Sequence, residues 1–222
     1  MANLFIIGIG GGNRDGMTRE AYQAISSSDI IAGYTSYVDL VSPLFPQKEI
    51  YSTGMMKESE RCEHALRLAA GGKKVALVCS GDAGVYGMAS LVYEIAATHA
   101  DFSSVEIEVI AGVTAALGGA ALLGAPLSHD FCIALYNPRS KNRPDTLKNA
   151  CRILMEKLSP DTPCGWARNI SREGEESHIC TLSQLAEADL DMFCTAFIGN
   201  STTKILTING RQKLVTPRGY QK

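Results

Sequence analysis

The residues best suited to chemistry lie between Ser80 and Gly87, where the chain reads Ser-Gly-Asp-Ala-Gly-Val-Tyr-Gly. One carboxylate, Asp82, stands among three glycines. The preceding apolar run, Val75–Cys79, is typical of a strand that is buried on both faces. Ligands of parallel α/β sheets bind at this carboxyl end of a strand, and glycines let the backbone approach them closely. The stretch therefore predicts a ligand-binding turn in preference to an ordinary strand-to-helix loop.

A second candidate is the pair His129–Asp130, which we expect in a turn before a strand. A neighbouring carboxylate can tune a histidine for acid–base catalysis. A loop hydrogen bond or a cap is the alternative that the pattern alone favours. The other histidines are scattered along the chain, and none has the spacing of a metal-ligand set. No metal site is expected.

The first glycine cluster, Gly8–Asn13, follows the strand-like run Leu4–Ile7. It fails the dinucleotide fingerprint because Asn13 occupies the third glycine position, and because the next strand has its acidic residue at the start. No glycine-rich turn ends in Gly-Lys-Ser/Thr, and no Gly-x-Ser-x-Gly elbow occurs. These absences exclude the commonest nucleotide and serine-hydrolase sites. The cluster is still expected to pack against a ligand or another backbone segment.

The composition points to a globular cytoplasmic protein. The chain has 222 residues, 45% of them hydrophobic, and a formal net charge of -2, so no basic surface predicts nucleic acid or an anionic membrane as a partner. No apolar run reaches the roughly 18 residues of a membrane span, and the N-terminal residues lack the pattern of a signal peptide. The seven cysteines are odd in number and include no Cys-x-x-Cys pair. We expect them to be reduced and buried.

The elements that must position these residues fall into two halves. The first alternates apolar strands with amphipathic helices, which predicts a parallel sheet with right-handed crossovers. The second predicts a mixed sheet with an antiparallel edge, because Asn209–Gly210 is a hairpin turn signal. We expect two αβα domains, residues 1–125 and 126–222, with a small molecule bound in the cleft between them. The expected strands are Leu4–Ile7, Asp29–Tyr34, Val75–Cys79, Val105–Ile110, Ile133–Tyr136, Gly165–Arg168, Ile179–Thr181, Cys194–Ile198, Ile205–Ile208 and Lys213–Val215.

The stretch from Ser80 to Ala89 resembles the tetrapyrrole methylase family, and further motifs of that family follow the same order along nearly the whole chain. The ordered set is specific although each motif alone is weak, and its last members favour the subgroup that methylates C17 of precorrin-3B or cobalt-precorrin-3 in cobalamin biosynthesis. The motifs are Gly8–Gly12, Thr53–Met55 with Glu58 and Arg61–Cys62, Gly112–Ala115, Leu123–Leu127, His129–Cys132, Tyr136–Ser140, Gly199–Ser201 and Thr216–Tyr220.

The resemblance implies S-adenosylmethionine as the cofactor, a tetrapyrrole substrate and a homodimer. It implies that methyl transfer at C17 accompanies contraction of the macrocycle, a step that moves protons, with Asp82, His129 and Asp130 as catalytic candidates. The substrate would face Gly10, Gly11 and Asn13, although Gly11 and Asn13 replace a proline and an acid that family members often carry. The implied cofactor-binding residues are Gly81, Asp82, Val85, Tyr86, Thr114, Ala115, Tyr136, Asn137, Ala167, Arg168, Gly199 and Asn200.

One departure from the family lies at the Cys132–Ile133 junction, where a helix-containing segment would normally separate two strands. A parallel crossover needs roughly a dozen residues, so we expect a segment to be missing between positions 132 and 133. Two other functions remain open from the residues. One is a sister methylase that acts at another corrin carbon, such as C11. The other is a module that binds S-adenosylmethionine without catalysis.

Overall fold

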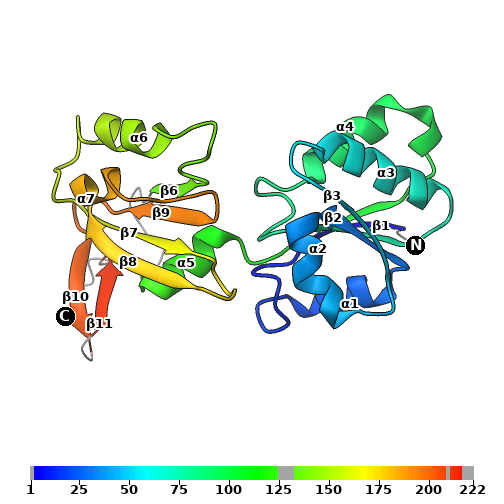
Figure 1. Cartoon of the computed structure of the whole chain (residues 1–222), viewed down its shortest axis with the longest axis horizontal. Helices are drawn as coiled ribbons and strands as arrows, with labels where there is room; N and C mark the ends of the chain where they lie inside the picture. Colours follow the sequence, from blue (N-terminus) through cyan, green and yellow to red (C-terminus); the bar gives the residue numbers. More distant parts are fainter. Residues whose placement is uncertain (1–2, 125–132, 209–210, 217–222) are drawn as a thin grey trace. The chain divides into compact units, whose positions relative to one another are not determined.

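The computed structural model describes residues 3–124, 133–208 and 211–216. The chain divides by its contacts into two compact units, Met1–Thr114 and Ala115–Lys222, which Figure 1 draws with their helices and strands labelled. The expected domain boundary at residues 125–126 lies outside the described residues, as does Cys132 of the junction discussed above. No helix in the described part of the chain is both long and apolar enough to cross a bilayer.

The first unit is built on a five-stranded parallel sheet in the order β3-β2-β4-β1-β5. Apolar residues fill both faces of the central strands, as expected for strands covered by helices on each side. Its strands are β1 (Leu4–Gly8), β2 (Ile30–Tyr34), β3 (Glu49–Thr53), β4 (Val75–Cys79) and β5 (Ile107–Ile110), and its helices are α1 (Arg19–Ser27), α2 (Thr35–Val41), α3 (Glu58–Ala70) and α4 (Ala89–Thr98), with short 3₁₀ turns at Ser42–Leu44 and Ala100–Phe102.

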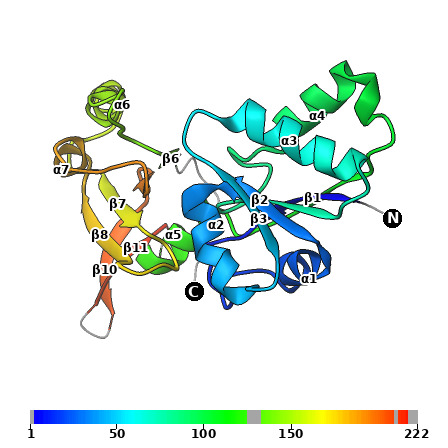
Figure 2. The ribbon, with the colours of Figure 1, turned by 45° about the vertical axis from the view of Figure 1, so that its right-hand side comes forward.

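Helices α3 and α4 cover one face of this sheet and helices α1 and α2 cover the other, as Figures 1 and 2 show. Leu77 and Leu4 face α3 and α4 in one buried cluster. Val78 and Ile7 face α1 and α2 in another. The alternation along β4 and β1 thus divides the apolar side chains between two cores. All five residues of β4 are buried, which confirms the strand predicted from its unbroken apolar run.

Two elements of this unit were missed from the sequence. Strand β3 is an edge strand whose residues are mostly exposed, so its composition does not show the apolar run of a central strand. Helix α2 has only seven residues and follows β2 without an intervening loop. It is shorter than the window over which helical periodicity becomes distinct.

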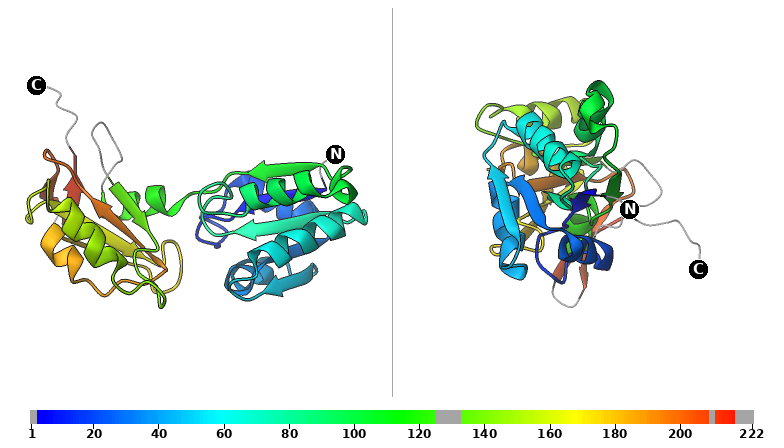
Figure 3. Two further views of the ribbon diagram at one scale, coloured as in Figure 1. Left: turned by 90° about the horizontal axis from the view of Figure 1, so that it is seen from above. Right: turned by 90° about the vertical axis from the view of Figure 1, so that its right-hand side faces the viewer.

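The second unit contains a four-stranded sheet in the order β6-β9-β7-β8 and a two-stranded β10-β11 pair. Helix α5 packs on one face beside Ala167 and Phe197, and helices α6 and α7 cover the other, an arrangement visible from above in Figure 3. The elements are α5 (Ala115–Leu123), β6 (Ile133–Tyr136), α6 (Thr146–Leu154), β7 (Pro163–Arg168), β8 (Glu176–Thr181), α7 (Leu182–Ala186), β9 (Cys194–Ile198), β10 (Lys204–Ile208) and β11 (Arg211–Val215).

The four-stranded sheet corrects one expectation, because every pairing in it is antiparallel and the sheet is not mixed. The reason is the position of β9, which lies between β6 and β7 and runs opposite to both. These two strands therefore share a direction without pairing with each other. The hairpin is confirmed by the antiparallel pairing of β10 with β11, while its turn residues lie outside the described part.

Candidate active site

The carboxyl ends of β1 and β4 form a topological switch point in the first unit. The two strands are parallel neighbours, with Gly8 opposite Cys79. The chain leaves β1 toward α1 on one face of the sheet and leaves β4 toward α4 on the other. Ligands of open α/β sheets bind where neighbouring connections diverge in this way. The glycine-rich loops singled out in the sequence are the ones that flank this point.

Three glycine backbones meet there without room for a side chain. A Cβ added to Gly112 would lie 2.0 Å from the carbonyl oxygen of Gly81 and 2.6 Å from the carbonyl of Gly8. A Cβ on Gly8 would lie 2.7 Å from both the Gly112 nitrogen and the Gly81 oxygen. Gly10 and Gly81 have φ of 55° and 67° and exchange backbone hydrogen bonds of 2.9 and 2.8 Å. The loops after β1, β4 and β5 are thus held together through backbone contacts.

The carboxylate of Asp82 fixes this arrangement. Its Oδ1 accepts hydrogen bonds from the backbone N–H groups of Gly84 (2.8 Å) and Val85 (3.2 Å). Its Oδ2 accepts one from Gly112 (2.9 Å), which follows β5. The charged acceptor therefore closes its own loop and ties it to the neighbouring one. This geometry gives Asp82 a positioning role in the unit.

The loop that Asp82 closes presents two of the expected cofactor-binding residues to solvent. Val85 is 39% exposed, and Tyr86 is 88% exposed with a φ of 54°. Gly87 is required at the end of the loop, because a Cβ there would lie 2.1 Å from the carbonyl oxygen of Ala83. An exposed aromatic side chain on a left-handed backbone, at the end of a buried strand, fits a ligand contact.

The expected substrate-facing residues occupy the loop after β1. Gly10 lies against Gly16, since an added Cβ would be 2.4 Å from the Gly16 oxygen. Asn13 accepts a hydrogen bond from the N–H of Gly16 (2.7 Å) through its side-chain oxygen. Gly11 lies between these two contacts. The loop is therefore closed by its own hydrogen bond, and Asn13 contributes an acceptor where family members often carry an acid.

In the second unit, Tyr136 and Asn137 lie at the carboxyl end of β6. The Tyr136 hydroxyl accepts a hydrogen bond from the N–H of Ala116 (2.9 Å) in the first turn of α5. This contact brings the start of α5, including Ala115, beside β6. Asn137 has a φ of 45°, and its amide, oriented to satisfy both groups, accepts from Arg143 (2.9 Å) and donates to the Arg139 carbonyl (3.2 Å).

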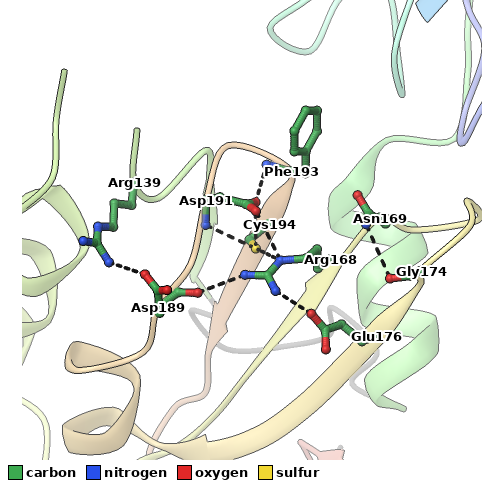
Figure 4. A network of polar contacts seen from close by, with 9 residues as sticks. All are labelled: Arg139, Arg168, Asn169, Gly174, Glu176, Asp189, Asp191, Phe193 and Cys194. Carbon is green, nitrogen blue, oxygen red and sulfur yellow. Dashed lines mark hydrogen bonds and ion pairs between the residues drawn. The ribbon is translucent and has the colours of Figure 1, made fainter. Parts of the chain in front are cut away.

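Arg168, at the end of β7, is the centre of the network in Figure 4. Its guanidinium donates to Glu176 (2.5 Å), to the Asp189 carbonyl (2.9 Å) and to the Cys194 sulfur (3.2 Å), and it lies 3.4 Å from Asp191. Each of these partners belongs to the second unit. The side chain of the other expected residue on this strand, Ala167, is fully buried under α5, so only its backbone can approach a ligand.

A cavity of about 600 Å³ opens on the α6–α7 face of this sheet. Trp166 and His178 lie directly opposite each other on its floor, with ring centroids 5.8 Å apart. Arg168 lies over Trp166 at 5.5 Å. The full lining comprises Trp166, Arg168, Glu176, His178, Cys180, Gln184, Ala188 and Asp189.

The remaining pair, Gly199 and Asn200, lies at the opposite end of the sheet from Tyr136. Strand β9 begins beside Tyr136 and Arg168 and ends beside Ile133. Its length separates the two ends by about 14 Å, at roughly 3.4 Å per residue. The structure therefore brings Tyr136, Asn137 and Arg168 together and places Gly199 and Asn200 apart from them.

Asn200 itself is 7% exposed, and its side-chain oxygen accepts from the backbone and hydroxyl groups of Thr202 (2.8 and 2.9 Å) and Thr203 (3.1 and 3.2 Å). Its Nδ2 has no partner among the described residues. The oxygen thus closes a local turn, which accounts for an asparagine at this position.

A signal that sequence reasoning missed lies in the loops after β6 and β7. Asn169 and Ser171 have φ of 50° and 59°, as Asn137 does at 45°, and all three follow strands that end at the same edge of the sheet. Left-handed backbone at non-glycine residues is uncommon and gathers at functional sites. The end of the sheet at which β6 and β7 finish is therefore the candidate ligand-facing end of the second unit.

The catalytic candidates His129 and Asp130 lie outside the described residues. The described residues contain no group of three or more ligands that could hold a metal ion. Six cysteines in the described part are free and buried. Burial raises the pKa of the Cys62 and Cys164 thiols to about 12, which leaves them protonated and poorly nucleophilic.

Comparison with known proteins identifies relatives along nearly the whole chain. A curated "probable cobalt-factor III C(17)-methyltransferase" of Salmonella typhimurium is 37% identical over 98% of this chain and 99% of its own length. A "precorrin-3B C(17)-methyltransferase" of a Sinorhizobium species is 34% identical over 98% of this chain and 96% of its own. The chain spans only 45% of the "cobalt-factor III methyltransferase" of Priestia megaterium, at 38% identity.

The solved structures that resemble this chain are also methyltransferases. The methyltransferase CobJ superimposes with a TM-score of 0.87 at 29% identity, over 98% of this chain and 100% of that one. A cobalt precorrin-4 methyltransferase shares the fold, with a TM-score of 0.74 at 22% identity over 88% and 94% of the two chains. The two-unit α/β fold predicted from the sequence is therefore confirmed.

The family model for tetrapyrrole (corrin/porphyrin) methylases matches residues 3–147. This match includes the three loops at the switch point and the start of the second unit. The alignment with the Salmonella relative runs over 244 positions, whereas this chain has 222 residues, so it contains gaps on the side of this chain. By its family model, its relatives and its fold, the chain belongs to the tetrapyrrole (corrin/porphyrin) methylases.

Proposed function

We propose that this protein transfers a methyl group from S-adenosylmethionine to C17 of cobalt-precorrin-3 or precorrin-3B, with ring contraction, in cobalamin biosynthesis. The observation that carries the proposal is the identity of 34–38% over nearly the whole chain to proteins named for this C17 methylation. The relatives named for cobalt-factor III and the one named for precorrin-3B differ little in identity, so we assign the substrate class and leave the cobalt content to experiment.

The first unit has the features that a cofactor site requires. The loop from Gly81 to Gly87 presents Tyr86 and Val85 on a backbone that Asp82 holds in place. The absence of side chains at Gly8 and Gly112 lets three loops meet, which fixes the backbone at the end of the sheet where ligands of such folds bind. When bound, S-adenosylmethionine supplies an electrophilic methyl group on a sulfonium.

The second unit would contribute the end of its sheet where β6 and β7 finish. Tyr136, Asn137 and the backbone beside Arg168 lie at this end. The left-handed conformation of Asn137 and Asn169 supports a ligand-facing role. We therefore favour this end for the cofactor over Gly199 and Asn200.

Methyl transfer to a ring carbon is an in-line displacement, so the main tasks of the protein are to orient two ligands and exclude water. A nucleophilic cysteine is not required, which agrees with the raised thiol pKa values. Ring contraction needs proton transfer in addition. We keep His129 and Asp130 as the acid–base candidates and assign Asp82 to cofactor positioning, because its carboxylate accepts three backbone hydrogen bonds. Gly10, Gly11 and Asn13 are proposed to face the tetrapyrrole.

The decisive experiment incubates the purified protein with cobalt-precorrin-3 and with precorrin-3B in separate anaerobic reactions, each with methyl-labelled S-adenosylmethionine. A mass gain of one methyl group, with the label mapped to C17 by NMR, is the expected result. A label at another ring carbon, such as C11, would identify a sister methylase. Binding of S-adenosylhomocysteine without transfer to either substrate would identify a non-catalytic binding module. Either of these outcomes overturns the proposal.

We also propose that the protein acts as a homodimer in the cytoplasm. The free, buried cysteines of the described part support a reducing compartment, and the family resemblance supports the dimer. Light scattering of the purified protein should give twice the mass of the 23.8 kDa chain, and a monomer mass would contradict it.

A further inference from the structure

The function proposed above does not by itself explain the buried guanidinium of Arg61. Arg61 lies in α3 and is 2% exposed. Its Nε donates to Thr53 Oγ1 (2.9 Å), and its Nη2 donates to the carbonyl groups of Thr53 (3.3 Å) and Gly54 (2.9 Å). Its Nη1 donates to the Met88 sulfur (3.6 Å). No ion pair joins it to a carboxylate within the described ranges. The side chain therefore fastens the backbone after β3 to the residue that precedes α4.

Neighbouring groups hold the same backbone from the side of β2. The Thr35 hydroxyl donates to the Thr53 carbonyl (3.2 Å), and the Tyr34 ring lies 5.8 Å from the guanidinium carbon of Arg61. Strands β3, β2 and β4 are successive neighbours in the sheet. Arg61 thus contacts the carboxyl ends of β3 and β2 and the residue that follows the Gly81–Gly87 loop.

The backbone held in this way presents two methionines to solvent. Met55 is 47% exposed and Met56 is 84% exposed. Met56 also has a φ of 61°, a conformation that non-glycine residues rarely adopt. From the sequence, core packing is the default expectation for these side chains, and the structure does not show it. Neither local propensity nor core packing explains why two apolar side chains are held here.

We propose that Arg61 is a positioning residue that holds Met55 and Met56 as an apolar contact surface for the face of the tetrapyrrole macrocycle. The inference rests on the function proposed above, which supplies the ligand. A conjugated macrocycle offers a broad aromatic face, and the polarisable, flexible thioether of methionine is well suited to such a surface. The segment is linked to the cofactor loop beneath the surface, because Met88, which follows Gly87 and is buried, accepts a hydrogen bond from Arg61.

The test measures two affinities for each variant: that for cobalt-precorrin-3 by its absorbance change, and that for S-adenosylhomocysteine by calorimetry. The double variant M55S/M56S alters exposed side chains only, so it should fold normally. It is expected to bind the tetrapyrrole about tenfold or more weakly, from the loss of two thioether–aromatic contacts, and to bind S-adenosylhomocysteine as the wild type does. The control I153S removes an apolar side chain of similar exposure, 56%, from α6 and should change neither affinity.

Arg61 is tested with R61M, which keeps the buried volume but removes the donors, and with R61K, which keeps the charge but not the planar fork. Both are expected to weaken tetrapyrrole binding as M55S/M56S does, because the hydrogen-bond geometry sets the loop. If either arginine variant fails to fold, T53V removes one acceptor of Arg61 and should give a smaller loss in the same direction.

The outcomes separate this inference from the proposed function. If the wild type binds the tetrapyrrole and M55S/M56S binds it equally well, the inference is refuted while the function stands. If the wild type binds no tetrapyrrole, the proposed function itself fails. Equal losses of both ligands in M55S/M56S would mean general damage to the unit, and would also refute the specific role.

Discussion

The contact among Gly8, Gly81 and Gly112 predicts a large effect from one added methyl group. In G112A, the new Cβ would lie 2.0 Å from the Gly81 oxygen and 2.6 Å from the Gly8 carbonyl. The Gly81 oxygen and both carbonyl atoms of Gly8 belong to the backbone, and Gly8 is held in β1 by the sheet. No side chain can therefore rotate away to make room. The loops after β4 and β5 must separate to admit the methyl group.

The cost can be worked from its parts. Overpacking a close contact costs about 1–3 kcal/mol. Separation of the loops also breaks the hydrogen bond from the Gly112 N–H to Asp82, and hydrogen bonds to charged groups contribute about 1.5–3 kcal/mol. We therefore expect the first unit to lose about 4 kcal/mol of its free energy of unfolding. S-adenosylhomocysteine affinity should fall with it, because the loop from Gly81 is displaced.

Urea unfolding followed by two probes measures this loss. Circular dichroism reports both units, whereas the fluorescence of Trp166, the single tryptophan, reports the second unit. The G112A transition should move to lower urea by circular dichroism and move less by fluorescence. The matched control is G54A, since an added Cβ at Gly54 has no heavy atom within 4 Å. It should keep the wild-type midpoint or exceed it slightly. A G112A protein within about 0.5 kcal/mol of the wild type would refute the reasoning.

Three further predictions concern single groups. D82N should weaken S-adenosylhomocysteine binding, while the pH profile of methyl transfer keeps its shape. A shifted pH profile would contradict the positioning role and indicate that Asp82 acts as an acid or base. R168M should lower the stability of the second unit by about 1 kcal/mol, because it removes the hydrogen bonds to Glu176, the Asp189 carbonyl and Cys194, whereas K148M, from an exposed ion pair, should change it by less than about 0.5 kcal/mol. The raised pKa values of Cys62 and Cys164, about 12 in the folded protein, mean that only the unfolded chain loses these protons above about pH 9. Stability should therefore be full below pH 9 and decline as pH rises toward 12, and urea midpoints measured across this range that stay flat would contradict the assignment.

Much of the first unit could be predicted because its signals are local. Val75–Cys79 is an unbroken apolar run, and the glycines that follow it are adjacent in the chain. Strand β3, in contrast, has an exposed edge position and a mixed composition, so its sequence resembles a loop. Its assignment depends on pairing with β2, which no local pattern records.

The second unit shows what local patterns leave out. Tyr136 ends one predicted strand and Gly199 follows another, and in a parallel sheet both would lie at the same end of the sheet. The antiparallel direction of β9 relative to β6 places them at opposite ends. Strand direction is set by the connections and by packing across the whole unit, so the sequence motifs could name the residues without grouping them. The left-handed Asn169 was missed for a related reason, since asparagine alone does not reveal its φ.

The failed dinucleotide fingerprint has a physical explanation in the same three glycines. In that fingerprint, closely spaced glycines admit a pyrophosphate to the start of one helix. Here Gly8, Gly81 and Gly112 are distant in the chain, and the lack of a side chain at Gly8 and at Gly112 leaves room for another backbone segment. The glycines therefore serve the junction of three loops, and Asp82 completes it by accepting the Gly112 N–H. Such a group of glycines is brought together by the fold and cannot be recognised from the spacing of residues in the sequence. The spacing test on Gly8–Asn13 compared positions within one loop, so it could not have found the contact that the first glycine makes with Gly81 and Gly112.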